Sequence, residues 1–303
     1  MKYLIVGISG QDGKISQLIS KETDNKIFGV SHNKKKVKNT FFWNGSSKDF
    51  NTILKKTNPD FVLNFAAIHN SSGQNPSQGN YKEMYDVNTA RVLIILESIL
   101  NFNKSIVYIN SLSSHIYEKK DSDKINENSL MKPRNFYGLT KIHSLKISEF
   151  FSDEFGLKVL NLIMFNHESE FRSKDFATKH IADSLAKIYL GLENKIFLEN
   201  KYSNEDFSDA YDFIRAIFYL TKNKKYGRYI LSSGQLTSLE NIIIKVAKKL
   251  NIENFDIISN SNESKNSIYG DNSKLLATNF KFESDIFNAV YRMTLKSIED
   301  YET

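Results

Sequence analysis

The sequence has no cysteine among its 303 residues, which excludes disulfide bonds, thiolate zinc sites and cysteine nucleophiles. Its six histidines show no spacing typical of metal ligands, so no metal site is predicted. Long apolar runs are also missing: the longest, Val92 to Leu100, is interrupted by Glu97 and is too short to cross a bilayer. The N-terminus enters an apolar strand without the layout of a signal peptide. We therefore expect a cytoplasmic protein with no membrane partner.

Charge of neither sign dominates the chain. Lysine and arginine number 41 against 35 aspartates and glutamates, and the net charge of +6 is spread in short clusters. There is no basic helix with interleaved aromatic residues, so nucleic acid is not an expected partner. Attraction to a phosphorylated small molecule explains the same balance. The length and the apolar content suit one large α/β domain or two lobes.

Glycines stand where the first apolar run ends. Residues 3–6 lead into Gly7, Gly10 and Gly13, and a helical apolar pattern follows. These glycines would allow a tight turn, a close approach of the backbone to a pyrophosphate, and close packing of helix on strand. The first N–H groups of the helix would then face the phosphates. A glycine-rich turn without a ligand is the alternative. We predict a dinucleotide site that includes Gly7, Gly10, Gln11, Asp12 and Gly13.

The end of the second apolar run bears on the choice of cofactor. An NAD enzyme usually presents an acid there to bond the ribose 2′-hydroxyl. Residues 31–38 instead contain no acid and four lysines. This favours a 2′-phosphate and hence NADP, with NAD as the alternative, and it adds His32, Asn33 and Lys34 to the cofactor site. A solvated lysine loop would look the same.

Apolar runs and helical patterns alternate through the first half of the chain. The runs cover 3–6, 26–30, 41–43, 61–67, 105–109 and 158–165. The helical patterns cover 14–22, 48–57, 84–103 and 137–155. Such alternation is typical of right-handed βαβ crossovers. It predicts the α/β class, with a Rossmann-type, doubly wound parallel sheet.

The pattern loosens after residue 165. We expect further helices near 176–191, 209–222 and 237–250, strands at 195–198 and 228–231, a surface loop at 259–268 and a weak tail. The segment 209–232 could return to the sheet. The expected dinucleotide-binding Rossmann domain is therefore 1–163 with 209–232, and a smaller C-terminal substrate-binding lobe is 164–208 with 233–303.

Tyr137 and Lys141 lie four residues apart in the helical pattern at 137–155. This spacing places both side chains on one face of a helix. The ammonium would favour the phenolate, lowering the pKa of the tyrosine so that it can serve as a general acid or base. Such pairs also occur by chance. The pair is therefore informative only together with the glycines and a serine at the right distance upstream.

In these segments the chain resembles the extended short-chain dehydrogenase/reductases of the NAD-dependent epimerase/dehydratase family, which modify nucleotide sugars. The nearest resemblance is to the branch of GDP-mannose 4,6-dehydratase and GDP-4-keto-6-deoxymannose reductase. It is carried by the segments 7–13, 64–67, 164–169 and 191–196, and it extends over nearly the whole chain.

The resemblance implies a catalytic triad of Ser113, Tyr137 and Lys141. The Ser113 hydroxyl would bond the substrate oxygen that Tyr137 protonates or deprotonates. Lys141 would also hold the nicotinamide ribose, and Ala66 and Phe165 would contact the cofactor. The residues expected to contact a small-molecule nucleotide sugar are Ser114, His115, Asn166, Lys179 and Arg215. The last two could instead be ordinary surface charges.

One departure from the family bears on the reaction. The dehydratases carry a glutamate two residues after the catalytic serine or threonine, to take a proton from carbon 5, and here that residue is His115. Hydride transfer at carbon 4 needs only the triad and the cofactor, so we favour a 4-keto-sugar reductase or 4-dehydrogenase. A GDP-mannose-type 4,6-dehydratase or an epimerase with recycled cofactor is the alternative. A non-catalytic, cofactor-binding regulator is the second alternative. The role of His115, catalytic or in the pocket wall, stays open.

Other departures concern the nucleotide. The arginine of the family's Arg-Asp-Phe is Glu205, and the arginine expected ahead of Gly270 is missing. The acid that binds adenine is replaced by Ser46, with Asp49 close by. The base and the sugar are therefore left open.

The helices at 84–103 and 137–155 bear on association. In relatives they pair across a two-fold axis as a four-helix bundle. The first carries more apolar residues than one sheet face should cover: Val92, Leu93, Ile95, Leu96, Ile99 and Leu100. We expect a homodimer, with a tetramer as the alternative.

Overall fold

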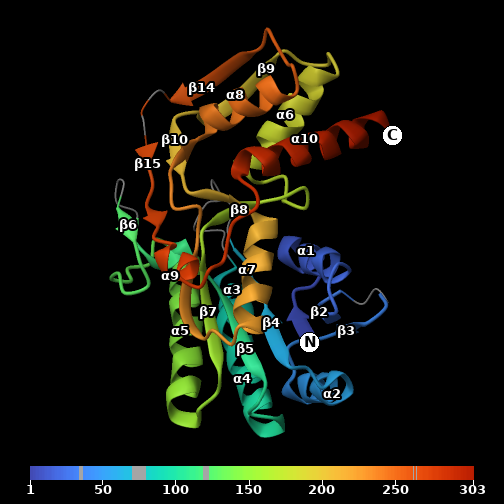
Figure 1. The fold of residues 1–303 in the computed structure, drawn as a ribbon, viewed down its shortest axis with the longest axis vertical. Coiled ribbons are helices and arrows are strands. Elements are labelled where there is room, and N and C mark those ends of the chain that lie inside the picture. Colours follow the sequence, from blue (N-terminus) through green and yellow to red (C-terminus); the bar gives the residue numbers. More distant parts are fainter. Residues whose placement is uncertain (34–36, 70–79, 119–122, 262, 264) are drawn as a thin grey trace. The chain divides into compact units, whose positions relative to one another are not determined.

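A parallel sheet of seven strands, in the order β12-β7-β5-β4-β1-β2-β3, is the centre of the fold (Figure 1). The computed structural model of the chain describes residues 1–33, 37–69, 80–118, 123–261, 263 and 265–303. The strands are β1 (Lys2–Val6), β2 (Lys26–Ser31), β3 (Thr40–Phe42), β4 (Phe61–Asn64), β5 (Val107–Ser113), β7 (Val159–Met164) and β12 (Gly227–Leu231). This arrangement confirms the predicted α/β class and the Rossmann-type sheet.

The sheet reverses its direction of winding between β1 and β4. From β1 the chain proceeds to β2 and β3 on one side, and from β4 it proceeds to β5 and β7 on the other. Ligands of open α/β sheets bind outside the carboxyl ends of the strands at such a switch point. The loops that follow β1 and β4 are therefore the ones that the topology places at a binding site.

Two strands differ in length from the prediction. The run at 61–67 forms a strand only as far as Asn64. The strand expected at 105–109 instead extends to Ser113, because its backbone continues to pair with β7 up to the register Ser113↔Met164. This correction places Ser111 and Ser113 on a rigid strand instead of in a loop.

Helices pack on this sheet. They are α1 (Gln11–Ser20), α2 (Ser47–Thr57), α3 (Tyr81–Tyr85), α4 (Arg91–Phe102), α5 (Phe136–Phe155) and α7 (Ala210–Lys222). The helix expected at 84–103 is interrupted by a π-helical turn over Asp86–Ala90. Such turns are rare and often lie at functional sites. Short 3₁₀ structure covers Ser114–Ile116.

The apolar face of α4 is largely used inside the chain. Val92, Ile95, Leu96 and Ile99 are buried and belong to one core cluster with residues of β1, β4, α2 and β7. Leu93 is 39% exposed. The six apolar residues therefore do not all face outward, and less of this helix is left for a second subunit than the sequence suggested.

The chain forms two compact units. The first consists of Met1–Glu118, Glu127–Met164 and Ile214–Tyr229, and the second of Lys119–Asn126, Phe165–Phe213 and Ile230–Thr303. The expected lobes differ from these units at residues 119–126, 164, 209–213 and 230–232.

The second unit has small sheets covered by helices. Its elements are β6 (Lys124–Ile125), β8 (Asn166–Glu168), α6 (Ala177–Tyr189), β9 (Lys195–Asn200), β10 (Ser203–Glu205), β11 (Phe207–Asp209), β13 (Thr237–Ser238), α8 (Leu239–Lys249), β14 (Asp256–Ser261), β15 (Lys265–Asn266), β16 (Tyr269–Gly270), α9 (Ser273–Leu276) and α10 (Ile286–Glu302). One apolar cluster is shared by α6, α8 and α10.

Two elements of this unit correct the sequence prediction. The weak tail is a helix of 17 residues, α10, whose N-terminus is capped by Asp285 accepting from the Asn288 N–H at 2.8 Å. Its buried residues Ile286, Val290 and Met293 recur at helical spacing. The loop expected at 259–268 is wrong in its first part, because β14 runs through Ser261 and pairs with β9.

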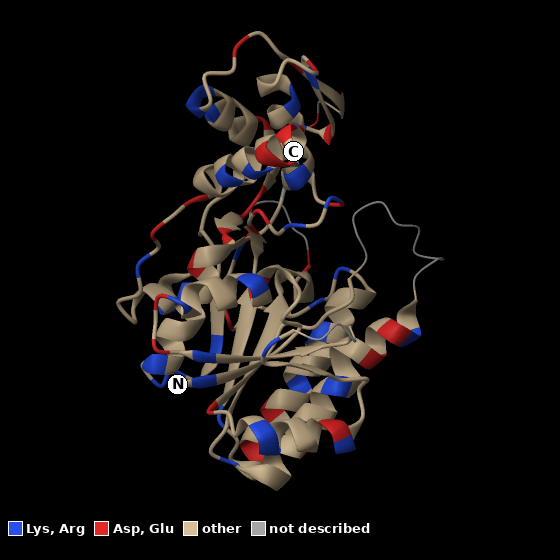
Figure 2. Cartoon of the chain, turned by 90° about the vertical axis from the view of Figure 1, so that its right-hand side faces the viewer, with Lys and Arg blue, Asp and Glu red and all other residues tan. Residues whose placement is uncertain are grey.

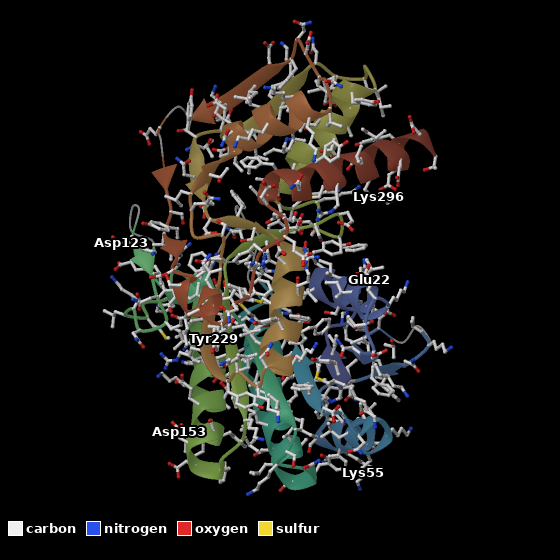
Figure 3. All side chains as sticks on the ribbon, in the orientation of Figure 1. Glu22, Lys55, Asp123, Asp153, Tyr229 and Lys296 are labelled. Carbon is white, nitrogen blue, oxygen red and sulfur yellow. The ribbon has the colours of Figure 1, made fainter. Side chains whose placement is uncertain are left out.

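Charged side chains are distributed over both units. Figure 2 shows lysine and arginine interspersed with aspartate and glutamate along the helices. Lys55 on α2, Asp153 on α5 and Lys296 on α10 are exposed, and Figure 3 shows them pointing away from their helices. Within the described ranges, no helix combines the length and the apolar character needed to cross a membrane.

Candidate active site

The helix α5 carries Tyr137 and Lys141 in its first two turns. It begins after Asn135, whose side-chain oxygen accepts from the Gly138 N–H at 2.9 Å and so satisfies one of the free donors of the first turn. It ends before Gly156, which has a φ of +69°. This left-handed conformation is the one that glycine adopts without strain at a helix C-terminus.

A buried polar network fixes α5 to the sheet. The Asn110 amide of β5 donates to Asn161 of β7 at 3.0 Å. From α5, the Ser144 hydroxyl donates to Asn110 at 2.9 Å and the Ser148 hydroxyl donates to Asn161 at 2.8 Å. These buried groups all have partners, and such satisfied networks specify one arrangement of the elements that they join. The position of α5 along the strands is thereby set.

Lys141 is 3% exposed. Its ammonium donates to the Ser111 carbonyl at 2.8 Å and lies 5.7 Å from the centre of the Tyr137 ring. Burial lowers the pKa of Lys141 to about 8, and the negative charge of Asp12 partly opposes this. At neutral pH the group is thus still mostly an ammonium, placed beside the phenol ring as the sequence predicted.

Ser113 stands at the end of β5, half-buried. Its hydroxyl oxygen accepts from the His115 N–H at 3.2 Å, which starts the 3₁₀ turn. The Tyr137 ring has the imidazoles of His115 and His69 at 5.7 Å each, both edge-on. The structure therefore brings the three predicted catalytic residues and His115 into one neighbourhood. Ser114, also predicted here, is 6% exposed.

The glycines of the first turn are required by contacts with the backbone. Gly7 has a φ of +90°, and a Cβ there would lie 2.7 Å from the Ala66 nitrogen. A Cβ on Gly13 would lie 2.5 Å from the Ile8 backbone. At Gly10 the nearest atom to an added Cβ is 3.4 Å away, which is an ordinary contact. The fold thus requires glycine at positions 7 and 13, whereas it would accept a residue with a Cβ at position 10.

A cavity of about 330 Å³ opens between the loops after β1 and β4. Of the residues predicted to bind a dinucleotide, Gly7, Gly10, His32 and Ala66 line it. Gln11, Asp12 and Gly13 form the first turn of α1. The Asn33 N–H donates to the Ser31 hydroxyl at 3.0 Å. Lys34 lies outside the described residues.

Sequence reasoning missed two side chains of this cavity. Trp43 is 2% exposed, and the Arg91 guanidinium lies 5.7 Å from its ring centre. Arg91 also pairs with Asp86 at 3.1 Å. Both line the cavity with His32. A lone tryptophan after the third strand was the only available signal. Ser46, which replaces the family's adenine-binding acid, caps α2 by accepting from the Asp49 N–H at 3.2 Å.

Asn88 of the π-helical turn was also missed. It is 1% exposed, accepts from the Ile68 N–H at 2.8 Å, and donates to the Ile68 carbonyl at 2.8 Å and to the Thr140 hydroxyl at 3.0 Å. One side chain therefore joins the segment after β4 to the helix of Tyr137.

The remaining predicted residues are contributed by other parts of the chain. Phe165, Asn166 and Lys179 belong to the second unit, while Arg215 is on α7. The Lys179 ammonium is buried against Asp183 at 2.6 Å and the Ser297 hydroxyl at 2.9 Å. Lys179 is therefore not an exposed surface charge, and its contact with a substrate stays a prediction.

The segment that replaces the family's Arg-Asp-Phe has a structural anchor at Asp206. Its carboxylate is buried and accepts from the N–H groups of Ser233, Gly234 and Gly270 at 2.9, 3.2 and 3.0 Å. Burial raises the pKa of Asp206, opposed by these hydrogen bonds. The aspartate thus joins its own segment to residues 233–234 and to Gly270 of β16. Across the described part of the chain, no group of histidine and acidic residues is arranged to hold a metal ion.

Comparison with known proteins identifies the family of the chain. A sequence model described as GDP-mannose 4,6 dehydratase matches residues 4–286. The GDP-mannose 4,6-dehydratase of Yersinia enterocolitica is 24% identical over 273 residues, covering 83% of this chain and 73% of that protein. The human GDP-mannose 4,6 dehydratase is 25% identical over 262 residues, covering 80% and 70%.

Solved structures share the fold. RMD from Pseudomonas aeruginosa, complexed with NADPH, superposes with a TM-score of 0.86 at 19% identity, covering 99% of this chain and 98% of that one. UDP-glucuronic acid 4-epimerase from Bacillus cereus, in complex with UDP-glucuronic acid and NAD, gives 0.81 at 17% identity, covering 99% and 100%. The match of the family model over most of the chain confirms the resemblance seen in the sequence: the protein belongs to the GDP-mannose 4,6-dehydratase family.

Proposed function

We propose that the protein transfers hydride between NADP(H) and carbon 4 of a nucleotide sugar, acting as a 4-keto-sugar reductase or, in reverse, a 4-dehydrogenase. The observation that carries the proposal is the Tyr137–Lys141 pair, with its buried ammonium 5.7 Å from the phenol ring, next to the strand end that bears Ser113. The family supplies the class of substrate: its curated relatives are GDP-mannose 4,6-dehydratases.

The cavity suits a dinucleotide. Gly7 and Gly10 leave no side chain between the backbone and the cavity, at the switch point where such cofactors bind. We propose that this backbone and the first turn of α1 hold the pyrophosphate, and that Ala66 lies under the nicotinamide. Phe165 stays a proposed contact from the second unit. When bound, the nicotinamide supplies or accepts the hydride.

Each side chain of the triad would have a different role in proton transfer to the substrate. In the direction of reduction, the Tyr137 phenol donates its proton to the carbon 4 oxygen. The Ser113 oxygen already accepts from the His115 N–H, so its hydroxyl hydrogen can be donated to the same substrate oxygen. The Lys141 ammonium favours the phenolate that remains. Its carbonyl partner on Ser111 holds that charge in place.

A direct assay tests the proposal. We expect the enzyme to oxidise NADPH when it is incubated with NADPH and GDP-4-keto-6-deoxymannose. The absorbance of NADPH should fall in proportion to the amount of sugar reduced. Supplying GDP-mannose alone should give no keto-deoxy product. Formation of that product without net change in NADPH would contradict the reductase proposal.

The second candidate is a 4,6-dehydratase, and the names of the curated relatives favour it. It would need a base for the carbon 5 proton. His115 occupies the sequence position of the family's glutamate, and its imidazole lies 5.7 Å from the Tyr137 ring. An epimerase with recycled cofactor would use the same triad. The assay with GDP-mannose separates the dehydratase from a reductase, and an epimerase would instead give a stereoisomer of its substrate without net change in NADPH.

The two contacting glycines and Gly10 should respond differently to a methyl group. Gly13→Ala is expected to lower the free energy of unfolding by about 1–3 kcal/mol, because the new Cβ meets the Ile8 backbone at 2.5 Å. Gly10→Ala is expected to change it by less than about 0.5 kcal/mol and yet weaken NADPH binding by about tenfold or more, because Gly10 lines the cavity. Urea unfolding and fluorescence titration measure the two effects. Unchanged affinity in Gly10→Ala would place the phosphates elsewhere.

We further propose that NADP(H) binds more tightly than NAD(H), by about tenfold at low salt, because no acid follows β2 and basic groups do. His32 and Arg91 line the cavity there. Replacing residues 34–36, three lysines outside the described residues, with serine should remove most of the margin, and added salt should shrink it. Serine at Lys55 and Lys56 of α2 is the control, expected to leave the ratio unchanged. Equal binding of both cofactors by the parent at low salt would refute this.

A homodimer through α4 and α5 remains our proposal, with a tetramer as the alternative. Leu93 on α4 and Phe150 and Phe155 on α5 are 39%, 54% and 39% exposed, which supports a surface that a second copy covers. Light scattering at micromolar concentration should give twice the mass of 34.9 kDa, and Phe150→Lys should shift it toward the monomer. A monomeric parent would rule the proposal out.

A further inference from the structure

We propose that Asn135 is a positioning residue that holds His115 as a neutral imidazole with its proton on Nε2, so that His115 serves as a hydrogen-bond donor to the sugar. The inference deepens the proposed function and rests on it for the identity of the acceptor, an oxygen on or next to carbon 4. The juxtaposition that carries it is the Asn135 amide 3.2 Å from the His115 Nδ1.

The cap of α5 fixes which way the Asn135 amide faces. Its oxygen must be the atom that meets the Gly138 N–H at 2.9 Å, because a backbone N–H can only donate. The NH₂ group is then the atom that faces the His115 Nδ1 at 3.2 Å. Since this group donates, Nδ1 must accept. The helix cap thereby sets the donor and acceptor of a contact outside the helix.

His115 itself is held by its backbone on both sides. Its N–H donates to the Ser113 hydroxyl at 3.2 Å, and its carbonyl accepts from the Arg134 N–H at 3.1 Å. Gly138 packs directly on that carbonyl, so that a Cβ there would collide with it. The start of α5 therefore rests against the His115 backbone. The His115 side chain is thereby placed next to Asn135, the cap residue of the same helix.

An acceptor at Nδ1 determines what the rest of the ring can do. In the neutral imidazole one nitrogen accepts and the other carries the proton, so the proton is on Nε2. A doubly protonated ring would bring an N–H against the Asn135 NH₂, so this contact disfavours the imidazolium. To act as a base at carbon 5, Nε2 would first have to lose its proton and Nδ1 gain one against the same NH₂. The position of the dehydratase glutamate is thus filled by a donor.

Nitrogen NMR of the full-length protein with labelled histidines tests the tautomer without substrate. The parent is expected to show a His115 pair with a pyrrole-like Nε2 and a pyridine-like Nδ1, assigned by its loss in His115→Gln. Asn135→Asp keeps an oxygen for the Gly138 cap but places a second oxygen against Nδ1, and should move a proton onto Nδ1. A parent with the proton on Nδ1, or a spectrum unchanged by Asn135→Asp, would overturn the proposal.

Kinetics test the role. His115→Gln offers an N–H near the place of Nε2 and is expected to keep the KM for the keto sugar within about fivefold, while His115→Leu raises it by about tenfold or more, with the KM for NADPH unchanged in both. Equal losses in the two variants would overturn the donor role. Asp285→Asn, at the N-cap of α10, is a control for Asn135→Asp. It makes the reverse exchange of amide and carboxylate at a helix cap and is expected to have no effect on KM. A parent without turnover but with the expected tautomer would refute the proposed function and leave the Asn135 contact standing.

Discussion

Replacing Tyr137 with phenylalanine is expected to lower kcat by about 10²- to 10⁴-fold, the usual contribution of a positioned general acid or base. The change removes one oxygen and leaves the ring that contacts His115 and His69. The Tyr137 backbone carbonyl still accepts from the Thr140 hydroxyl at 2.7 Å, so the helix start is preserved. Steady-state reduction of the keto sugar, with NADPH binding measured separately, is the readout.

Two comparisons make this result specific. NADPH should bind to Tyr137→Phe with nearly the affinity of the parent, because the phenol acts on the substrate oxygen. Tyr189→Phe, at a tyrosine of α6 that is 53% exposed, makes the same atomic change and should leave kcat within about twofold. Wild-type turnover in Tyr137→Phe would assign the proton to another group, whereas a parent without turnover would favour the non-catalytic, cofactor-binding regulator.

The architecture was readable from the sequence because its signals are local. Alternating apolar runs and helical patterns are sufficient to predict a parallel sheet, and glycines at 7, 10 and 13 mark the first turn. The Tyr137–Lys141 pair needs only the helical period to share a face. The expectation that the two side chains meet therefore did not depend on any knowledge of the tertiary structure.

Contacts between distant segments could not be read in this way. The carbonyl that holds Lys141 belongs to Ser111, 30 residues away, and the prediction had ended the strand before it. Asn135 was not predicted as a site residue, and in the structure it caps α5. Its second partner, His115, is brought there by the meeting of β5 and α5. Pairing with β7 decides where β5 ends, and pairing is not a local property.

Two local signals in the sequence, both of helical spacing, were also missed. The spacing of Ile286, Val290 and Met293 in α10 is helical, yet the prediction gave this segment only as a weak tail. The ion pair of Lys179 with Asp183 was not predicted, although Asp183 stands four residues later, at the spacing of a helical ion pair. In both cases the helical spacing of the residues was enough to predict the helix or the ion pair.

Lys141→Met is expected to separate catalysis from stability. The variant should lose about 10²-fold or more in kcat, because no ammonium remains to favour the Tyr137 phenolate. Its folding should survive, because methionine fills a buried site of similar length and the Ser111 carbonyl lies within the β5–β7 ladder. The matched control is Lys146→Met on the same helix, where the ammonium is exposed and pairs with Glu149 at 3.2 Å.

The stability difference should depend on pH with a definite sign. The pKa of Lys141 is about 8 in the folded chain, below its ordinary value of 10.5, so between these values the unfolded chain binds more protons. The stability of the parent therefore rises with pH across this window, as the cost of burying the ammonium is relieved.

From pH 7 to pH 9.5 the parent should gain about 2 kcal/mol relative to Lys141→Met, measured by urea unfolding of both. Lys146→Met should track the parent. Parallel curves for the parent and Lys141→Met would mean that Lys141 is charged and solvated throughout, and its proposed action on Tyr137 would then need another explanation.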